Sequence, residues 1–236
     1  MTIQAFVFDL FGTLIDMTSI SKVLSELNIV KDNPKPFIET WQSKQLQYAW
    51  LLTLINKFEP FSDLSVRALK FTSKINSVKL NDKQIKRISE AQLELDRFPD
   101  SKKGLEELKS KESNPSENEK NKKTKQLAIL SNGESSKTKK LLSNASLLQY
   151  FDHIFSAEEV GKYKPAKEVY MLVSERLNLS VSETALVSSN LWDIAGAQAA
   201  GMQTCWINRE GKKTNEELDL RPDYILSSIE DLKEII

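Results

Sequence analysis

The sequence contains very little cysteine and histidine. Among its 236 residues there is one cysteine, Cys205, and one histidine, His153. A single cysteine excludes an intrachain disulfide and a metal site built from several cysteines, and it fits a reducing, cytoplasmic compartment. A single histidine excludes a zinc site made of several histidines. We expect both residues to be structural, Cys205 inside a strand and His153 at the start of one.

The chain also lacks an excess of charge and any long apolar run. Its 33 Lys and Arg residues balance its 33 Asp and Glu residues, so the formal net charge is +0. Because no basic excess is present to neutralise phosphates, we expect no nucleic-acid partner. No apolar run approaches the roughly 20 residues that span a bilayer, and no basic region precedes an apolar segment at the N-terminus. We therefore expect neither a membrane anchor nor a signal peptide.

A block of helical patterns without glycine follows the first few residues. No glycine occurs between Gly12 and Gly104, and residues 19–95 show almost only the helical spacing of apolar side chains. The longest pattern is KPFIETWQSKQLQYAWLLTLINKF, followed by LSVRALKFTSKIN and KQIKRISEAQLEL. These patterns predict an all-helical insert, a small bundle, over residues 16–97.

Short apolar segments typical of strands lie on either side of this block. They are IQAFVF, QLAILSNG, FDHIFSAEE, ETALVSSN, QTCWINR and PDYILSS. Since helical patterns separate most of them, they predict a parallel sheet covered by helices on both faces. The predicted fold class is α/β, with a doubly wound core over residues 1–15 and 98–236 and a helical cap domain inserted into it. Within the core, SNPSENEKNKKTK (113–125) is polar and aperiodic, and we expect an exposed, mobile loop there.

Polar side chains stand where the predicted strands end. They are Asp9 and Thr13, Ser131 and Asn132, Lys164 in a loop, Ser188 and Asn190, and Asp193 at the start of a helix. Ligands of open parallel sheets bind outside the carboxyl ends of the strands, so these side chains would gather at one edge. Each alone has a structural explanation as a cap, a turn residue or a surface lysine. Together they suggest a site, because a carboxylate can act as a nucleophile that a lysine keeps ionised, while free backbone N–H groups hold an anion.

Four short motifs stand in the order found in a known superfamily. FDLFGTL, LSNG, YKP and SSNLWD resemble the motifs of the haloacid dehalogenase (HAD) superfamily. The resemblance implies a HAD-like, Rossmann-like core, with Asp9 as the nucleophile and with Ser131 and Lys164 in the second and third motifs. Phosphatases of the superfamily carry an acid two residues after the nucleophile and an acidic magnesium ligand in motif four, where this sequence has Phe11 and Ser189. Two groups that phosphoryl transfer needs are therefore missing.

The closer resemblance is to the type II L-2-haloacid dehalogenases, and it covers nearly the whole chain. KQLQYAWLLTL, SAEEVGKYKPAKEVY, LVSSNLWDIAGAQAAGM and TCWINR resemble the corresponding segments of that family. A halide leaves without a proton, so the chemistry needs no acid at Phe11, no metal and no other cofactor. The resemblance implies that Asp9 attacks C2 of an L-2-haloacid, a small 2-halocarboxylic acid. Water then hydrolyses the aspartyl ester to a D-2-hydroxy acid.

The resemblance also implies which residues make up the site. The expected catalytic residues are Asp9, Thr13, Ser131, Lys164, Ser188, Asn190 and Asp193. The expected substrate-binding residues are Leu10, Phe11, Gln42, Leu46, Phe61, Asn132, Tyr170 and Trp192. Ser131 and the backbone amides near Leu10 and Phe11 would hold the substrate carboxylate, and Asn132 would help hold the halide.

The remaining roles concern the surroundings of the nucleophile. Lys164 and Asp193 would orient the nucleophile and balance its charge, with Tyr170 supporting the lysine. Ser188 and Asn190 would complete this network and help place the water. The alkyl group of the substrate would contact an apolar wall, although plain core packing explains its members equally well: Leu46, Phe61 and Trp192.

One residue departs from the family pattern. Where the family has a cap arginine that accepts the departing halide, this sequence has Gln42, within TWQSKQLQY. A neutral donor forms a weaker hydrogen bond than a charged one, and losing a charge-assisted bond at a transition state costs on the order of 2–4 kcal/mol, or about a hundredfold or more in rate. Lys44 would point about 200° away around the helix, so we do not expect it to replace the arginine.

Three hypotheses stay open at this point. The chain is an L-2-haloacid dehalogenase impaired by Gln42, another hydrolase of the superfamily such as a weak magnesium-dependent phosphatase, or a non-catalytic protein that keeps the fold. Phe11 and Ser189 count against the second, and the intact polar set counts against the third. The resemblance also implies a homodimer formed through the cap. The aromatic residues of WQSKQLQYAW would serve that interface or pack within the cap equally well.

Overall fold

The computed structural model describes residues 2–30, 32–113, 125–211 and 221–235. The six predicted strands are present, as β1 (Ala5–Phe8), β2 (Gln126–Ser131), β3 (His153–Ser156), β4 (Thr184–Ser188), β5 (Gln203–Ile207) and β6 (Tyr224–Leu226). The cap helices are η1 (Met17–Ile20), α1 (Ser21–Glu26), α2 (Lys35–Leu54), α3 (Phe61–Ile75) and α4 (Asp82–Ala91). The core helices are α5 (Pro99–Ser113), α6 (Ser135–Asn144), η2 (Leu148–Tyr150), η3 (Ala157–Glu159), α7 (Lys167–Leu177), η4 (Val181–Glu183), α8 (Leu191–Ala200) and η5 (Ile229–Glu234).

The sheet is parallel throughout, as predicted. Its strand order is β3-β2-β1-β4-β5-β6, and every neighbouring pair is parallel. Phe8, the last residue of β1, pairs with Ile129 of β2 on one side and with Val187 of β4 on the other. The strand order reverses between β1 and β4, and in open α/β sheets ligands bind in the crevice at such a reversal. Asp9 follows β1 at this point.

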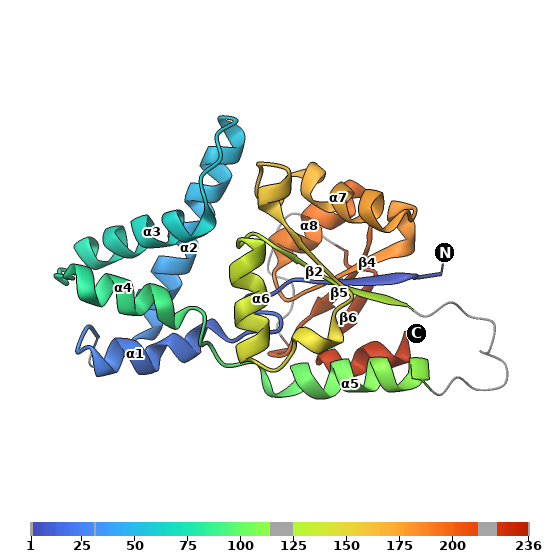
Figure 1. Ribbon diagram of the computed structural model, residues 1–236, viewed down its shortest axis with the longest axis horizontal. Coiled ribbons are helices and arrows are strands. Elements are labelled where there is room, and N and C mark those ends of the chain that lie inside the picture. Colours follow the sequence, from blue (N-terminus) through green and yellow to red (C-terminus); the bar gives the residue numbers. More distant parts are fainter. Residues whose placement is uncertain (1, 31, 114–124, 212–220, 236) are drawn as a thin grey trace.

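Helices cover both faces of the sheet, and β1, which is apolar at every position, packs against both layers. Ala5 and Val7 belong to one buried cluster, which includes apolar residues of α7 and α8. Phe6 and Phe8 point the other way, into a cluster that includes apolar residues of α5, α6 and η5. Figure 1 shows α7 and α8 on one side of the sheet and α5 on the other. The strand is therefore buried on both faces, as continuous apolar strands of parallel sheets are.

The cap helices form a separate group beside the sheet (Figure 1). No strand occurs among the described residues from 21 to 95, so the prediction of a helical insert agrees with the structure. The two connections to the core run side by side: Ile15 and Arg97 form an antiparallel bridge, and the Asp16 N–H donates to the Asp96 carbonyl at 2.8 Å. The division at residues 15/16 and 97/98 stays a prediction, which these adjacent crossings support.

Two other predictions concern the surface and the membrane. Of the predicted loop over residues 113–125, Ser113 is the last residue of α5 and Lys125 precedes β2, while residues 114–124 lie outside the described part of the chain. Within the described residues, no helix has the length and apolar character required to cross a bilayer.

Candidate active site

A tight turn places Asp9 at the carboxyl end of β1. The N–H groups of Leu14 and Ile15 donate back to the Leu10 carbonyl, at 2.9 and 3.0 Å. Gly12 has φ +84°, a left-handed conformation that L side chains rarely adopt, so the turn favours glycine here. The turn brings the Thr13 side chain back beside the carboxylate that precedes it.

Three side chains hold the Asp9 carboxylate, which is only 7% exposed. Its Oδ2 atom accepts from Thr13 Oγ1 at 2.8 Å and from Asn190 Nδ2 at 2.9 Å. Its Oδ1 atom accepts from Lys164 Nζ at 3.1 Å. These three donors fix the orientation of the carboxylate at the end of β1.

Lys164 is completely buried between two carboxylates. Its ammonium donates to Asp193 Oδ2 at 2.9 Å in addition to Asp9, and Asp193 Oδ1 accepts from the Tyr170 hydroxyl at 2.6 Å. Burial alone would lower the pKa of Lys164, but the charges of Asp193 and Asp9 outweigh it and raise that pKa above the usual 10.5. Burial raises the pKa of Asp193, and the neighbouring Asp9 charge adds to the effect against the opposing Lys164. The cluster thus buries two acids against one ammonium.

Tyr170 occupies a different position from the one expected. Its hydroxyl donates to Asp193, and the structure gives it no hydrogen bond to Lys164. Burial, followed by the charge of Asp193, raises the pKa of Tyr170 well above 10. Tyr170 therefore supports the lysine only through Asp193 and lies behind the site instead of lining it.

The main chain around the cluster is fixed by the remaining polar side chains. Thr13 Oγ1 accepts from the Ser189 N–H at 2.9 Å, and Ser188 Oγ accepts from the Asn190 N–H at 3.1 Å. Asn132 Oδ1 accepts from the Lys164 N–H at 2.9 Å. These bonds join the end of β1 to that of β4 and the end of β2 to the lysine loop, so neighbouring loops that carry the polar side chains are held together.

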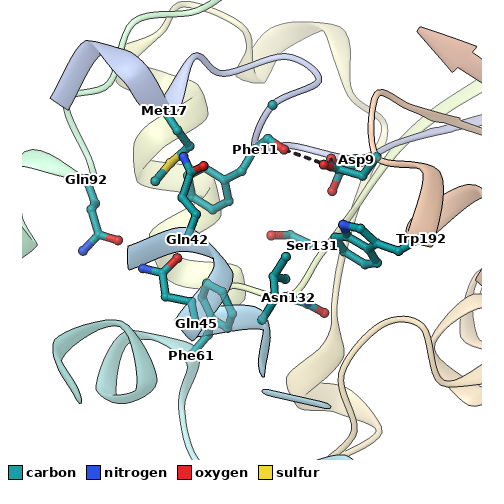
Figure 2. Close-up of a pocket in the computed structure, with 13 residues that line it drawn as sticks. Asp9, Phe11, Met17, Gln42, Gln45, Phe61, Gln92, Ser131, Asn132 and Trp192 are labelled. Carbon is teal, nitrogen blue, oxygen red and sulfur yellow. Dashed lines mark hydrogen bonds between the residues drawn. The ribbon is translucent and has the colours of Figure 1, made fainter. Parts of the chain in front are cut away.

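A cavity of about 130 Å³ opens in front of Asp9. Figure 2 shows Gln42 and Gln45 of the cap on one side of it, with Asp9, Ser131 and Trp192 of the core on the other. The lining residues are Asp9, Phe11, Gly12, Met17, Gln42, Gln45, Leu46, Phe61, Gln92, Ser131, Asn132, Asn190 and Trp192. The predicted substrate-binding residues Phe11, Gln42, Leu46, Phe61, Asn132 and Trp192 are all among them.

Gln42 lies on the cap side of the cavity, half-buried. No hydrogen bond joins its carboxamide to another of the described residues, so it is open to a ligand. Lys44 does not share this position: its ammonium lies 4.1 Å from the centre of the Phe71 ring and donates to Gln47. The expectation that Lys44 does not replace the family arginine agrees with this geometry.

Anion donors stand near the nucleophile. Among the described residues, the backbone N–H groups of Leu10 and Phe11 have no protein acceptor, and Ser131 Oγ, which accepts from the Gly133 N–H at 3.0 Å, keeps its own proton to donate. The Leu10 side chain is buried in the core and is absent from the cavity wall. Only its backbone is placed for the binding role expected of it.

Several residues of this site are not among those predicted from the sequence. Met17, Gln45 and Gln92 line the cavity. Gln45 lies three residues after Gln42 on the same helix, a spacing that could have revealed it. Met17 and Gln92 carried no such signal, because their positions depend on how the cap packs on the core.

Comparison with known proteins identifies the family. The family model of haloacid dehalogenase-like hydrolases matches residues 3–201. The chain belongs to this family. It is 34% identical over 233 residues to an (S)-2-haloacid dehalogenase of Pseudomonas sp. (strain YL), covering 99% of this chain and 94% of that relative. It is 31% identical over 234 residues to (S)-2-haloacid dehalogenase 2 of Pseudomonas sp. (strain CBS-3), covering 99% of this chain and 96% of the relative.

A solved haloacid dehalogenase-like structure extends the comparison to the fold. The L-2-haloacid dehalogenase from Xanthobacter autotrophicus with chloropropionic acid covalently bound matches with a TM-score of 0.86 and 25% identity. The match covers 99% of this chain and 98% of that one. This chain therefore shares its overall fold with that dehalogenase.

Proposed function

We propose that this chain is an L-2-haloacid dehalogenase that uses Asp9 as its nucleophile. The observation that carries the proposal is a buried carboxylate facing a small cavity, held by Thr13, Asn190 and Lys164, with Phe11 two residues further on. Phenylalanine cannot protonate a leaving group, and a halide needs no proton. The relatives named (S)-2-haloacid dehalogenase, aligned over nearly the whole chain, support the same reaction.

The first step forms an ester on the enzyme. An Asp9 oxygen attacks C2 of the L-2-haloacid from the side opposite the halogen, the C–O bond forms, and the C–halogen bond breaks with its electron pair leaving on the halide. Attack from behind directs the halide away from Asp9, towards the cap side where Gln42 lies. Gln42 and the Asn132 amide would donate N–H groups to the halide, and both line the cavity.

The second step returns the carboxylate. Water attacks the carbonyl carbon of the Asp9 ester, the bond from that carbon to the alkyl oxygen breaks, and a D-2-hydroxy acid leaves with one proton released overall. Ser188 and Asn190 would help place the water, since Ser188 fixes the Asn190 backbone. Lys164 and Asp193 would balance the charge of Asp9 through both steps.

Substrate binding follows from the donors and the wall around the cavity. The substrate carboxylate would accept from Ser131 and from the backbone N–H groups of Leu10 and Phe11. Its alkyl group would contact Leu46, Phe61 and Trp192, for which a cavity of about 130 Å³ favours a short chain.

We also propose a homodimer and a cytoplasmic location. Trp41 is buried and Trp50 bonds to the core, so the aromatic residues of the cap helix are used within the chain. An interface would instead use the exposed apolar side chains at the end of α2, Leu51, Leu54 and Ile55. Light scattering of the purified protein measures its mass in solution, and therefore whether it is a dimer.

The free, buried thiol of Cys205 fits a reducing compartment.

The experiment is halide release from L- and D-2-chloropropionate, each with and without EDTA, beside p-nitrophenyl phosphate hydrolysis with magnesium. We expect release from the L-acid alone, insensitive to EDTA, and none from Asp9→Asn. Magnesium-dependent phosphate release without any halide, lost in Asp9→Asn, would overturn the dehalogenase assignment and leave a phosphatase. If the wild type shows no activity in either assay, the dehalogenase assignment is overturned as well.

A further inference from the structure

The segment that supplies the lysine is held by the cap as well as by the core. Tyr163 and Lys164 lie between η3 and α7, and both are completely buried. The Lys164 N–H donates to Asn132 of the core at 2.9 Å. Its carbonyl accepts from the indole N–H of Trp50, in the cap helix α2, at 3.1 Å. The main chain of Lys164 is thus hydrogen-bonded to the core through its N–H and to the cap through its carbonyl.

The residue before the lysine is attached to the cap even more closely. The Tyr163 N–H donates to Thr53 Oγ1 at 3.0 Å, and its hydroxyl donates to the Glu59 carbonyl. Its ring stacks on Phe58, with centroids 5.0 Å apart, and lies 5.7 Å from the centroid of Phe61. The peptide groups before Tyr163 and after Lys164 are therefore both bonded to side chains in the last turns of α2, Thr53 and Trp50.

Trp50 also continues the face of α2 that lines the cavity. Gln42, Leu46 and Trp50 are spaced by four residues, so they stand on successive turns of one side of the helix. The Trp50 ring meets the pocket residue Trp192 edge-on, with centroids 5.9 Å apart and an interplanar angle of 70°. One rigid helix face thus carries the proposed halide donor, part of the alkyl wall and the contact to the lysine.

We propose that Trp50 is a positioning residue for Lys164. Its indole N–H, donated from the cap to the lysine's carbonyl, keeps the ammonium in line with Asp9 while the cap is seated on the core. The ammonium reaches Asp9 at 3.1 Å and Asp193 at 2.9 Å with almost no exposure to solvent, so a small shift of its main chain breaks one or both contacts. Packing of the cap on the core and alignment of Lys164 with Asp9 and Asp193 therefore occur together.

The test uses Trp50→Phe, which keeps an aromatic ring beside Trp192 but removes the N–H. Trp41→Phe is a matched control, because the Trp41 indole also donates to a backbone carbonyl, that of Ser65 at 2.9 Å, entirely within the cap. Thr53→Val removes the neighbouring bond to Tyr163 and should act in the same direction as Trp50→Phe. Folding of every variant is followed by its melting temperature.

Two readouts separate positioning from simple structural support. The activity readout rests on the proposed dehalogenase function: we expect kcat for L-2-chloropropionate to fall about 2-fold to 12-fold in Trp50→Phe, the effect of one lost hydrogen bond, with KM changed less than about twofold. The second readout needs no substrate. Acetic anhydride labelling, resolved by mass spectrometry, should modify Lys164 several times faster in Trp50→Phe than in the wild type.

The control decides the interpretation. Unchanged kcat and unchanged Lys164 labelling in Trp50→Phe would overturn the proposal, and so would equal losses in Trp50→Phe and Trp41→Phe, which indicate general loosening of the cap. If the wild type releases no halide, the dehalogenase assignment fails, and the labelling alone decides the role of Trp50. Faster labelling of Lys164 in Trp50→Phe and Thr53→Val, but not in Trp41→Phe, supports it.

Discussion

Replacing Gln42 by arginine should accelerate halide release. Gln42 lines the cavity on the side opposite Asp9, and its carboxamide has no partner among the described residues. The arginine would bring a positive charge to a site that holds Asp9 and Asp193 against Lys164 alone, and that must also accept an anionic substrate. A fixed cation there opposes this excess of negative charge at the point where the halide develops its own.

The magnitude follows from the kind of hydrogen bond involved. A net hydrogen bond between neutral groups contributes about 0.5–1.5 kcal/mol, and one to a charged group about 1.5–3 kcal/mol. Losing a preorganised donor at a developing charge costs about 2.7–4 kcal/mol. Gln42 already supplies a neutral donor, so we expect Gln42→Arg to lower the barrier only by the difference, about 1–3 kcal/mol, or roughly 5-fold to 150-fold in rate. Because the halide charge is absent from the bound substrate and develops as the C–halogen bond breaks, kcat should rise more than KM changes.

The assay is steady-state chloride release from L-2-chloropropionate at several substrate concentrations. Gln47→Arg provides a matched control, since it adds the same charge to an exposed position of the same helix, outside the cavity. It should leave kcat within about twofold of the wild type, because exposed charges are screened by solvent and salt. An unchanged or lower kcat in a well-folded Gln42→Arg protein, or an equal gain in Gln47→Arg, would refute the reasoning.

Three further predictions test other parts of the site. The ratio of kcat for L-2-bromopropionate to kcat for L-2-chloropropionate should be higher in the wild type than in Gln42→Arg, because bromide is the better leaving group and depends less on a hydrogen-bond donor. Equal ratios in the two proteins would contradict this. Lys164→Met should reduce the free energy of unfolding by about 3–5 kcal/mol, because two buried carboxylates lose their cation. The raised pKa of Lys164 means that this loss is full below pH 10.5 and shrinks as the pH rises further, which denaturant titrations at several pH values measure. Gly196→Ala should lower both activity and melting temperature, although alanine favours helices, because its Cβ would lie 2.5 Å from the Tyr170 hydroxyl; normal activity would show that Tyr170 is free to move.

Much of the core could be predicted because its signals are local. Each strand is a short apolar segment, and the polar residue that ends it is next to it in the sequence. Parallel topology then brings those ends together without further information, which is why Asp9, Ser131, Asn190 and Asp193 were expected at one edge. The hydrogen bonds of Thr13 and Lys164 to Asp9 agree with that expectation.

The cap side of the site could not be predicted in the same way. Helical periodicity identifies α2, but the turns of it that meet the core depend on packing between segments far apart in the sequence. Trp50 meets the Lys164 carbonyl across 114 positions, and Gln92 reaches the cavity from the residues after α4. That Tyr170 supports Lys164 through Asp193 could not be predicted for a similar reason, since Asp193 and Lys164 are adjacent in space and the sequence does not say which of them is nearer its hydroxyl.

The most direct test of the central claim, nucleophilic attack by Asp9, is isotope incorporation. The enzyme turns over L-2-chloropropionate many times in H₂¹⁸O, and the peptide that contains Asp9 is then weighed by mass spectrometry, with the peptide that contains Asp193 as an internal control. If water cleaves the ester at the Asp9 carbonyl, the Asp9 peptide gains ¹⁸O and the Asp193 peptide does not. Halide release with an unlabelled Asp9, and with the label in the hydroxy acid from the first turnover, would show that water attacks the substrate carbon directly and would contradict the account.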